Sequence, residues 1–194
     1  MTAYDRRTAL VVVDVQNDFA DPAGSLAVTG GPEVVDAVNT EVATATAAGA
    51  LVAYTQDWHP ADTPHFAKDG GTWPVHCVQG TWGAELHPRL DVLGEVVRKG
   101  ENGEDGYSGF TMKDPVGDET VPTRLEAMLR SHGVERLVVV GLATDYCVRA
   151  TALDGRRLGW PVTVPWHAVR AVDLEPGDGE RTRNELLDAG VEVT

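Results

Sequence analysis

The chain has 194 residues, of which 42% are hydrophobic and 24% are charged, and this size and balance predict a single globular domain over 1–194. A formal net charge of −14 makes nucleic acid and anionic membrane surfaces poor partners, so we exclude both as binding targets. Two cysteines are too few for a disulfide framework, no apolar run is long enough to span a bilayer, and the apolar stretch after Arg7 is too short for a signal peptide. We therefore expect a cytoplasmic protein with free thiols.

The first half of the chain alternates between strand and helix patterns. Residues 8–15, TALVVVDV, form a short β-branched run that predicts a strand buried on both faces. Valines recur at helical spacing over 32–49, where a proline suits the first turn and a glycine suits the end, so this segment is predicted as a helix. Residues 50–56 and 94–99 are predicted as the second and third strands.

The second half continues the same alternation. Its clearest strand pattern is a valine-rich run at 135–142. The glycine-rich, acidic stretch 100–119 is predicted as a loop, either solvated or closing over a pocket as a lid. The remaining elements are strands at 161–166 and 191–194 and helices at 121–133, 145–159 and 179–190. Strands that alternate with helices predict the α/β class, with a mainly parallel sheet covered on both faces.

Reactive side chains stand where the predicted strands end. Asp14 follows the apolar core of the first strand, and Asp57 and His59 follow the second. Lys99 ends the third strand, and Cys147 comes just after the valine-rich strand. Because ligands of parallel α/β sheets bind outside the carboxyl ends of the strands, we expect these five residues to converge on one edge.

Cys147 is the candidate nucleophile at this edge. A helix N-terminus and the nearby cation of Lys99 are expected to lower the pKa of its thiol, and Asp14 can take the thiol proton as a general base. Backbone N–H groups around Ala143 and Cys147 can form an oxyanion hole. Taken singly, Cys147 is better explained as a packed thiol, Asp14 as a turn residue and Lys99 as a solvated side chain. Their common position at one edge favours catalysis, whereas Cys77 is predicted to serve packing.

A metal site is predicted beside the thiol. Asp57 and His59 are two residues apart on an extended segment, so their side chains point the same way and can reach one ion. His65 and His76 follow after short loops, and one carboxylate with three imidazoles suits Zn²⁺, Fe²⁺ or Mn²⁺. The alternative is that these histidines cap turns of a proline-rich loop.

The motifs, taken together, resemble those of one known family. They stand in the family's order from about Thr8 to about Ala171 and read VVVDVQNDF, DWHPADTPHF, WPVHCVQGTWG, RKG, YSGF and VVGLATDYCVRATALD. The chain is similar in these segments to the nicotinamidase/pyrazinamidase branch of the isochorismatase-like cysteine hydrolases. The resemblance implies a three-layer, Rossmann-like α/β/α fold.

The resemblance also implies roles for individual residues. Asp14, Lys99 and Cys147 match the catalytic triad, and a cis peptide bond between Leu142 and Ala143 would aim the amides of Ala143 and Cys147 at an oxyanion. Four positions match residues that bind the substrate ring: Phe19, Trp73, Tyr107 and Leu142. The implied metal ligands are Asp57, His59 and His76, joined in one subgroup by a histidine at the position of His65. Two features depart from the pattern, namely a longer loop at 100–106 and the Trp166–His167 pair where many relatives carry an aspartate.

The function that the resemblance implies is a metal-dependent amidohydrolase of NAD salvage. It would convert nicotinamide to nicotinate and ammonia, and pyrazinamide to pyrazinoate, through a thioester on Cys147. Its partners would be a small-molecule substrate and one divalent ion. The sequence allows a homo-oligomer but does not determine the oligomeric state. The alternatives are a metal-independent relative that cleaves a carbamoyl or ureido substrate, a redox- or metal-sensing module, and a binding protein that has lost activity.

Overall fold

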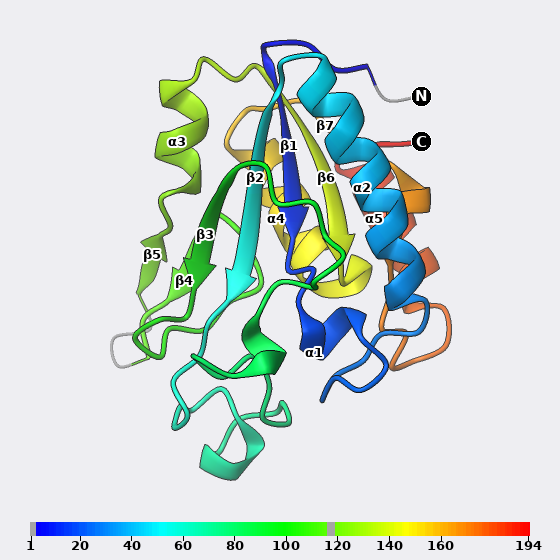
Figure 1. The fold of residues 1–194 in the computed structure, drawn as a ribbon. Coiled ribbons are helices and arrows are strands. Elements are labelled where there is room, and N and C mark those ends of the chain that lie inside the picture. The colour runs from blue at the N-terminus through cyan, green and yellow to red at the C-terminus, as the bar shows by residue number, and fades with distance from the viewer. Residues whose placement is uncertain (1–2, 116–118) are drawn as a thin grey trace.

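The computed structural model describes residues 3–115 and 119–194 and is built around one parallel sheet (Figure 1). Its strand order is β3-β2-β1-β6-β7-β9, and every pairing in this sheet is parallel. The strands are β1 (Thr8–Val13), β2 (Leu51–Asp57), β3 (Glu95–Lys99), β6 (Arg136–Leu142), β7 (Val162–Val164), β8 (Val169–Arg170), which pairs with the end of β6, and β9 (Glu192–Val193). The predicted parallel sheet is therefore confirmed.

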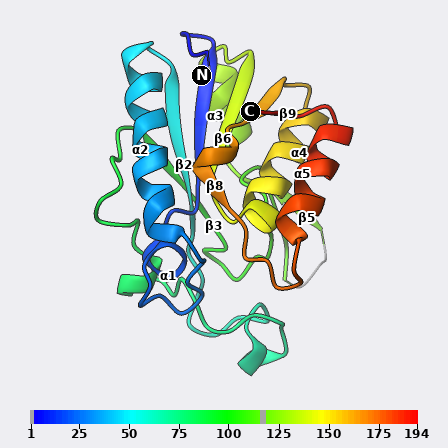
Figure 2. The same cartoon turned by 90° about the vertical axis from the view of Figure 1, so that its right-hand side faces the viewer.

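Helices cover both faces of the sheet, as Figure 2 shows. One face carries α2 (Gly31–Ala47), and the other carries α3 (Leu125–Ser131), α4 (Arg149–Arg157) and α5 (Asp178–Asp188). Side chains of β1 alternate between the two faces: Leu10 and Val12 pack in the core under α2, and Val11 packs in the core under the other three helices. The predicted three-layer α/β/α fold is confirmed.

Close packing of α4 on the sheet depends on a glycine that is not a turn residue. A Cβ atom at Gly155 would lie 2.9 Å from a methyl group of Leu137 and 3.1 Å from a methyl group of Val162. The glycine that interrupts the helix pattern of 145–159 therefore serves the approach of helix to sheet. It does not end the helix, because α4 continues to Arg157.

The region after β3 differs from its prediction. Strands β4 (Thr111–Lys113) and β5 (Thr120–Pro122) pair antiparallel, so the stretch 100–119 is not one unstructured loop. Part of that stretch, 116–118, lies outside the described residues. The predicted helix at 121–133 is wrong in its first turn, because β5 occupies it and α3 begins at Leu125, whose N–H is accepted by Thr123 Oγ1.

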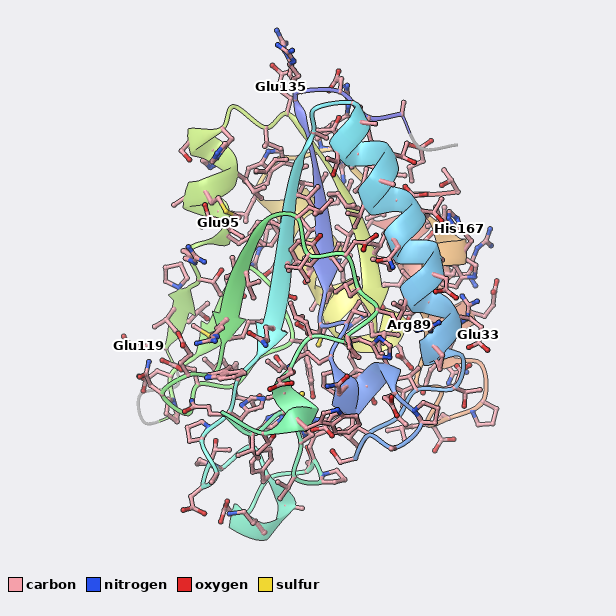
Figure 3. The ribbon with its side chains drawn as sticks, in the orientation of Figure 1. Glu33, Arg89, Glu95, Glu119, Glu135 and His167 are labelled. Atoms are coloured by element: carbon pink, nitrogen blue, oxygen red, sulfur yellow. The ribbon has the colours of Figure 1, made fainter. Side chains whose placement is uncertain are left out.

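The carboxyl ends of β1, β2 and β3 open onto a long connection. In Figure 1 the first part of this segment, residues 58–94, hangs below the arrowheads of the strands, and its last part runs back up to the start of β3. It contains two short 3₁₀ turns, Ala67–Asp69 and Trp82–Ala84, and lies beside helix α1 (Asn17–Ala20). The opposite end of the sheet carries surface ion pairs such as Glu135 with Arg7 at 2.8 Å (Figure 3). Among the helices of residues 3–115 and 119–194, none combines the length and the hydropathy needed to cross a bilayer.

Candidate active site

Four of the predicted residues meet at one buried point. Lys99 Nζ lies 2.8 Å from Asp14 Oδ2, 2.9 Å from Asp57 Oδ1 and 3.8 Å from Cys147 Sγ. The ligand atoms of Asp14, Asp57 and Cys147 all lie within 4.8 Å of one another, and every one of these side chains is buried. The expectation that separate strand ends bring an acid, an ammonium and a thiol together agrees with this geometry.

A glutamine fixes the strand ends that carry the two aspartates. The side chain of Gln16 donates from Nε2 to the carbonyl of Asp57 at 2.7 Å and accepts the N–H of Asp57 at 2.8 Å. The same Nε2 donates to the carbonyl of Ala84 at 2.9 Å. Gln16 therefore joins the chain after β1 to the end of β2. Its place two residues after Asp14 was the only sequence signal for this role.

The buried charges at this point compensate one another. Burial opposes the charge of Lys99, but the carboxylates of Asp14 and Asp57 outweigh it and raise the pKa of Lys99 well above its ordinary value. Burial also works to raise the pKa of Asp57, yet Lys99 and the neighbouring histidines lower it to about 2. An ammonium and a carboxylate therefore stay charged in a site that excludes bulk water.

The thiol of Cys147 is not easily ionised in the structure, contrary to the prediction from sequence. Cys147 lies on a π-helical turn, Thr144–Val148, that leads into α4. Burial raises the pKa of the Cys147 thiol well above its ordinary value, and Asp14 and Asp57 add to this shift, while Lys99 opposes it. Burial also raises the pKa of Asp14 against the opposing charge of Lys99, so Asp14 is a stronger base than an exposed aspartate.

Three histidines lie together next to this point. Ring nitrogens of His59, His65 and His76 lie within 4.8 Å of one another, and His59 Nε2 is 3.9 Å from Asp57 Oδ2. All three imidazoles are buried. Burial lowers the pKa of His59 to about 4 and also lowers that of His76, so both rings are favoured in the neutral form that binds metals.

The hydrogen bonds of these rings leave their lone pairs facing one another. His76 Nδ1 donates to the carbonyl of Pro74 and His65 Nδ1 donates to Asp105, each at 2.7 Å, since a carbonyl and a carboxylate only accept. The two Nε2 atoms then face each other at 3.4 Å as acceptors. Neither ring nitrogen of His59 makes a hydrogen bond within residues 3–115 and 119–194. A cation between the three rings would bind one nitrogen of each, so the donor set fits a divalent metal.

A cavity of about 330 Å³ connects the thiol to the histidines. Its walls include His65, His76 and Cys147, and the sequence predictions Phe19 and Trp73. Further lining residues are Val28, Asp57, Tyr107, Ala143, Tyr146, Val172 and Leu174. The cavity thus presents the candidate nucleophile and three of the metal-ligand candidates, Asp57, His65 and His76, to the same small molecule.

Three aromatic rings form one wall of the cavity. Trp73 Nε1 donates to the hydroxyl of Tyr107 at 3.0 Å, and the ring of Tyr146 lies 5.0 Å from Trp73 and 5.4 Å from Tyr107. Tyr146 was missed from sequence, although it immediately precedes Cys147. Leu142, predicted for the ring pocket, is absent from the lining of this cavity, and its side chain is fully buried in the core under α2.

The backbone around Ala143 follows the expectation drawn from the motifs. The Leu142–Ala143 peptide bond is cis, and Ala143 and Cys147 both line the cavity. His167, in contrast, lies beside α2, where Figure 3 labels it. Its Nε2 atom is 3.3 Å from a carboxylate oxygen of Glu41. Its 3₁₀ turn, Trp166–Ala168, is absent from the lining of the cavity.

Comparison with known proteins agrees with this site. The model of the isochorismatase domain family matches residues 8–193. The nicotinamidase/pyrazinamidase of Mycobacterium tuberculosis is 41% identical, over 95% of this chain and 97% of its own length. The structure of the pyrazinamidase of Pyrococcus horikoshii in complex with zinc is similar with a TM-score of 0.86 and 38% identity, covering 97% of this chain and 98% of that one. PnC1 of L. infantum in complex with nicotinate gives a TM-score of 0.88 and 36% identity, over 100% of this chain and 95% of that one. The motif-based resemblance is thereby confirmed, and the chain belongs to the isochorismatase family.

Proposed function

We propose that the protein is a nicotinamidase, which hydrolyses nicotinamide to nicotinate and ammonia and also acts on pyrazinamide. The observation that carries this proposal is the cavity in which Cys147 faces the imidazoles of His65 and His76. A pyridine carboxamide has two polar ends, a ring nitrogen and an amide, and this cavity offers a partner to each. Relatives named nicotinamidase or pyrazinamidase, at 41% and 38% identity over nearly the whole chain, support the assignment.

In this proposal one divalent ion is held by Asp57, His59, His65 and His76. When bound, the ion would act as a Lewis acid that holds the ring nitrogen of the substrate, directly or through water, and so orients the ring. The zinc complex of the similar pyrazinamidase supports zinc, while the donor set also accepts iron or manganese. The neutral imidazoles and the ionised carboxyl of Asp57 are the protonation states that such binding needs.

The covalent steps are proposed for the buried triad. Asp14 takes the proton of the Cys147 thiol as sulfur attacks the amide carbon, and Lys99 stabilises the developing thiolate. The carbonyl oxygen becomes an oxyanion, which accepts hydrogen bonds from the N–H groups of Ala143 and Cys147. Asp14 then gives its proton to the amide nitrogen, the C–N bond breaks, ammonia leaves, and a thioester remains on Cys147.

Hydrolysis of the thioester repeats the same two proton transfers, now from water to Asp14 and from Asp14 to sulfur. Asp14 takes a proton from a water molecule as the water oxygen attacks the thioester carbon. The C–S bond breaks, Asp14 returns the proton to the sulfur of Cys147, and the carboxylic acid is released. A base whose pKa is raised by burial suits both uses, because it binds a proton readily and is regenerated in each half of the cycle.

The three histidines argue against the alternatives. A metal-independent amidohydrolase of a carbamoyl or ureido substrate needs no cluster of lone pairs beside the thiol, and the cluster is present. A sensor module needs a thiol that is accessible and readily ionised, whereas Cys147 is only 6% exposed and burial raises its pKa. We keep the small-molecule substrate, the cytoplasmic location and an open oligomeric state as parts of this proposal.

The test is ammonia release from nicotinamide before and after removal of metal. We expect activity in the purified protein, loss of at least nine-tenths of it after a strong chelator, and recovery when Zn²⁺, Fe²⁺ or Mn²⁺ is returned. Full activity at negligible metal content, or turnover of a carbamoyl substrate in place of nicotinamide, would assign the protein to the metal-independent branch.

A further inference from the structure

Asp105 accepts a hydrogen bond from the ring of His65. Its Oδ1 atom lies 2.7 Å from His65 Nδ1. The His65 ring is buried, and the Asp105 side chain is 54% exposed. Because a carboxylate only accepts, the proton of neutral His65 is held on Nδ1, and the lone pair is left on Nε2. That Nε2 atom is the one that faces His76 Nε2 at 3.4 Å.

The backbone of Asp105 is itself held in place. Its N–H donates to the carbonyl of Lys113 at 2.9 Å, and its carbonyl accepts the N–H of Lys113 at 2.5 Å. This pair is an isolated antiparallel bridge to β4, whose Lys113 also pairs with Thr120 of β5. The carboxylate thus projects from an ordered position toward a ring that belongs to a different loop.

The other two histidines of the cluster are held differently. His76 has its Nδ1 proton committed to the carbonyl of Pro74, two residues away on the same loop. His59 lies against Gly100, where a Cβ atom would be 2.7 Å from its Nδ1. His65 is the one whose orientation depends on a titratable side chain from a distant segment. His65 is therefore the histidine of the cluster whose ring orientation depends on a half-exposed residue, Asp105.

We propose that Asp105 is a positioning residue that makes His65 a fourth protein ligand of the metal. The inference rests on the metal site of the proposed function and adds to it a residue outside the ligand set. Asp105 holds the Nδ1 tautomer and the ring angle of His65, so that Nε2 is presented to the ion without reorganisation. Loss of such an outer partner typically lowers metal affinity about 10- to 100-fold.

Charge alone offers a competing explanation, since an anion near a cation also raises affinity. The chain provides a matched control in Glu104, the adjacent carboxylate, whose oxygens accept hydrogen bonds from Asn102 instead. Glu104→Gln removes one negative charge next to the site and leaves the His65 hydrogen bond intact. Asp105→Asn removes the same charge but keeps an oxygen that can accept, and Asp105→Ala removes both.

The experiment measures the affinity of the metal-free protein for Zn²⁺ by competition with a chromophoric chelator. We expect Asp105→Ala to weaken binding about 10- to 100-fold, Asp105→Asn to weaken it less, and Glu104→Gln to leave it within twofold of wild type. In a His65→Ala background, Asp105→Ala should have no further effect. The visible spectrum of the Co²⁺-loaded protein should change with His65→Ala and with Asp105→Ala in the same way.

Several results would overturn the inference. They are Asp105→Ala within twofold of wild type, Asp105→Asn equal to Asp105→Ala, or an equal loss from Asp105→Ala with and without His65. Asp105→Ser, which stops short of the ring, repeats the test if the alanine variant fails to fold. A wild-type protein that binds no Zn²⁺ would refute the proposed metal site itself, so the two failures are distinguishable.

Discussion

The ammonium of Lys99 lies 2.8 Å from a carboxylate oxygen of Asp14, and both side chains are almost completely buried. Lys99 also neutralises Asp57 at 2.9 Å, so one cation compensates two buried carboxylates from separate strands. Lys99 therefore links the proposed triad, which contains Asp14, to the proposed metal site, which contains Asp57. Removal of the cation should therefore be felt in both stability and chemistry.

Lys99→Met tests this compensation. We predict that it abolishes ammonia release and lowers the free energy of unfolding of the metal-free protein by about 3–5 kcal/mol, because two buried carboxylates lose their partner. The measurement is urea unfolding, with Arg98→Met as the control on the same strand. Arg98 is a partly exposed neighbour whose loss should change stability by about 1 kcal/mol or less. Equal effects of the two variants would show that the buried pair has no special role.

The pH dependence of activity should follow the base. Asp14 must be deprotonated to accept the thiol proton, and burial raises its pKa above the ordinary value of 3.8. Activity is therefore lost as pH falls through that raised pKa, and the acid limb of kcat/KM should lie above the pH expected for an exposed aspartate. The profile is measured on metal-loaded protein, with circular dichroism to confirm that the fold persists. Asp14→Asn should abolish ammonia release. An acid limb of kcat/KM centred at pH 3.8 or below would contradict the assignment of Asp14 as the base.

Gly100 is predicted to keep room for a metal ligand. It has a φ of +80°, and a Cβ atom there would lie 2.7 Å from His59 Nδ1. Gly103 has a similar φ of +90°, but its nearest contact would be at 3.9 Å. Both alanine variants should lose about 1–2 kcal/mol of stability through the left-handed backbone. Only Gly100→Ala should also lose Zn²⁺ affinity; equal metal binding by both variants would refute the steric argument.

Tyr146→Ala tests the aromatic wall. Tyr146 lines the cavity, and one aromatic contact with a substrate ring is worth about 0.5–1.5 kcal/mol, so its loss should raise KM up to about tenfold while kcat changes little. We expect kcat to change little because the proposed mechanism uses no hydrogen bond of Tyr146. Steady-state kinetics on nicotinamide separates the two constants. A fall in kcat with KM unchanged would assign Tyr146 to the chemistry and not to binding.

Much of this architecture was predictable because strand ends are readable from sequence. The β-branched runs at 8–15 and 135–142 predicted β1 and β6, and the parallel rule then placed Asp14 and Cys147 on one edge. The helix at 32–49 was found from the spacing of its valines, because one face of α2 is buried along its length.

The features that the sequence did not predict depend on contacts between distant segments. The hairpin of β4 and β5 consists of three-residue strands, which are too short to show a period. The roles of Gln16 and Asp105 rest on partners 41 and 40 residues away, and no local pattern reveals such pairs. The pKa of Cys147 was predicted with the wrong sign because the sequence showed a helix start and a cation but not the depth of burial. That 1–194 forms one domain stays a prediction.

The most direct test of the account is to trap its covalent intermediate. Protein mixed with nicotinamide is quenched in acid within milliseconds, digested and examined by mass spectrometry. The account predicts a nicotinoyl thioester on the peptide that contains Cys147, absent from Cys147→Ala, which should stay folded and release no ammonia. Turnover near the wild-type rate in Cys147→Ala, or an acyl group on any other residue, would contradict it.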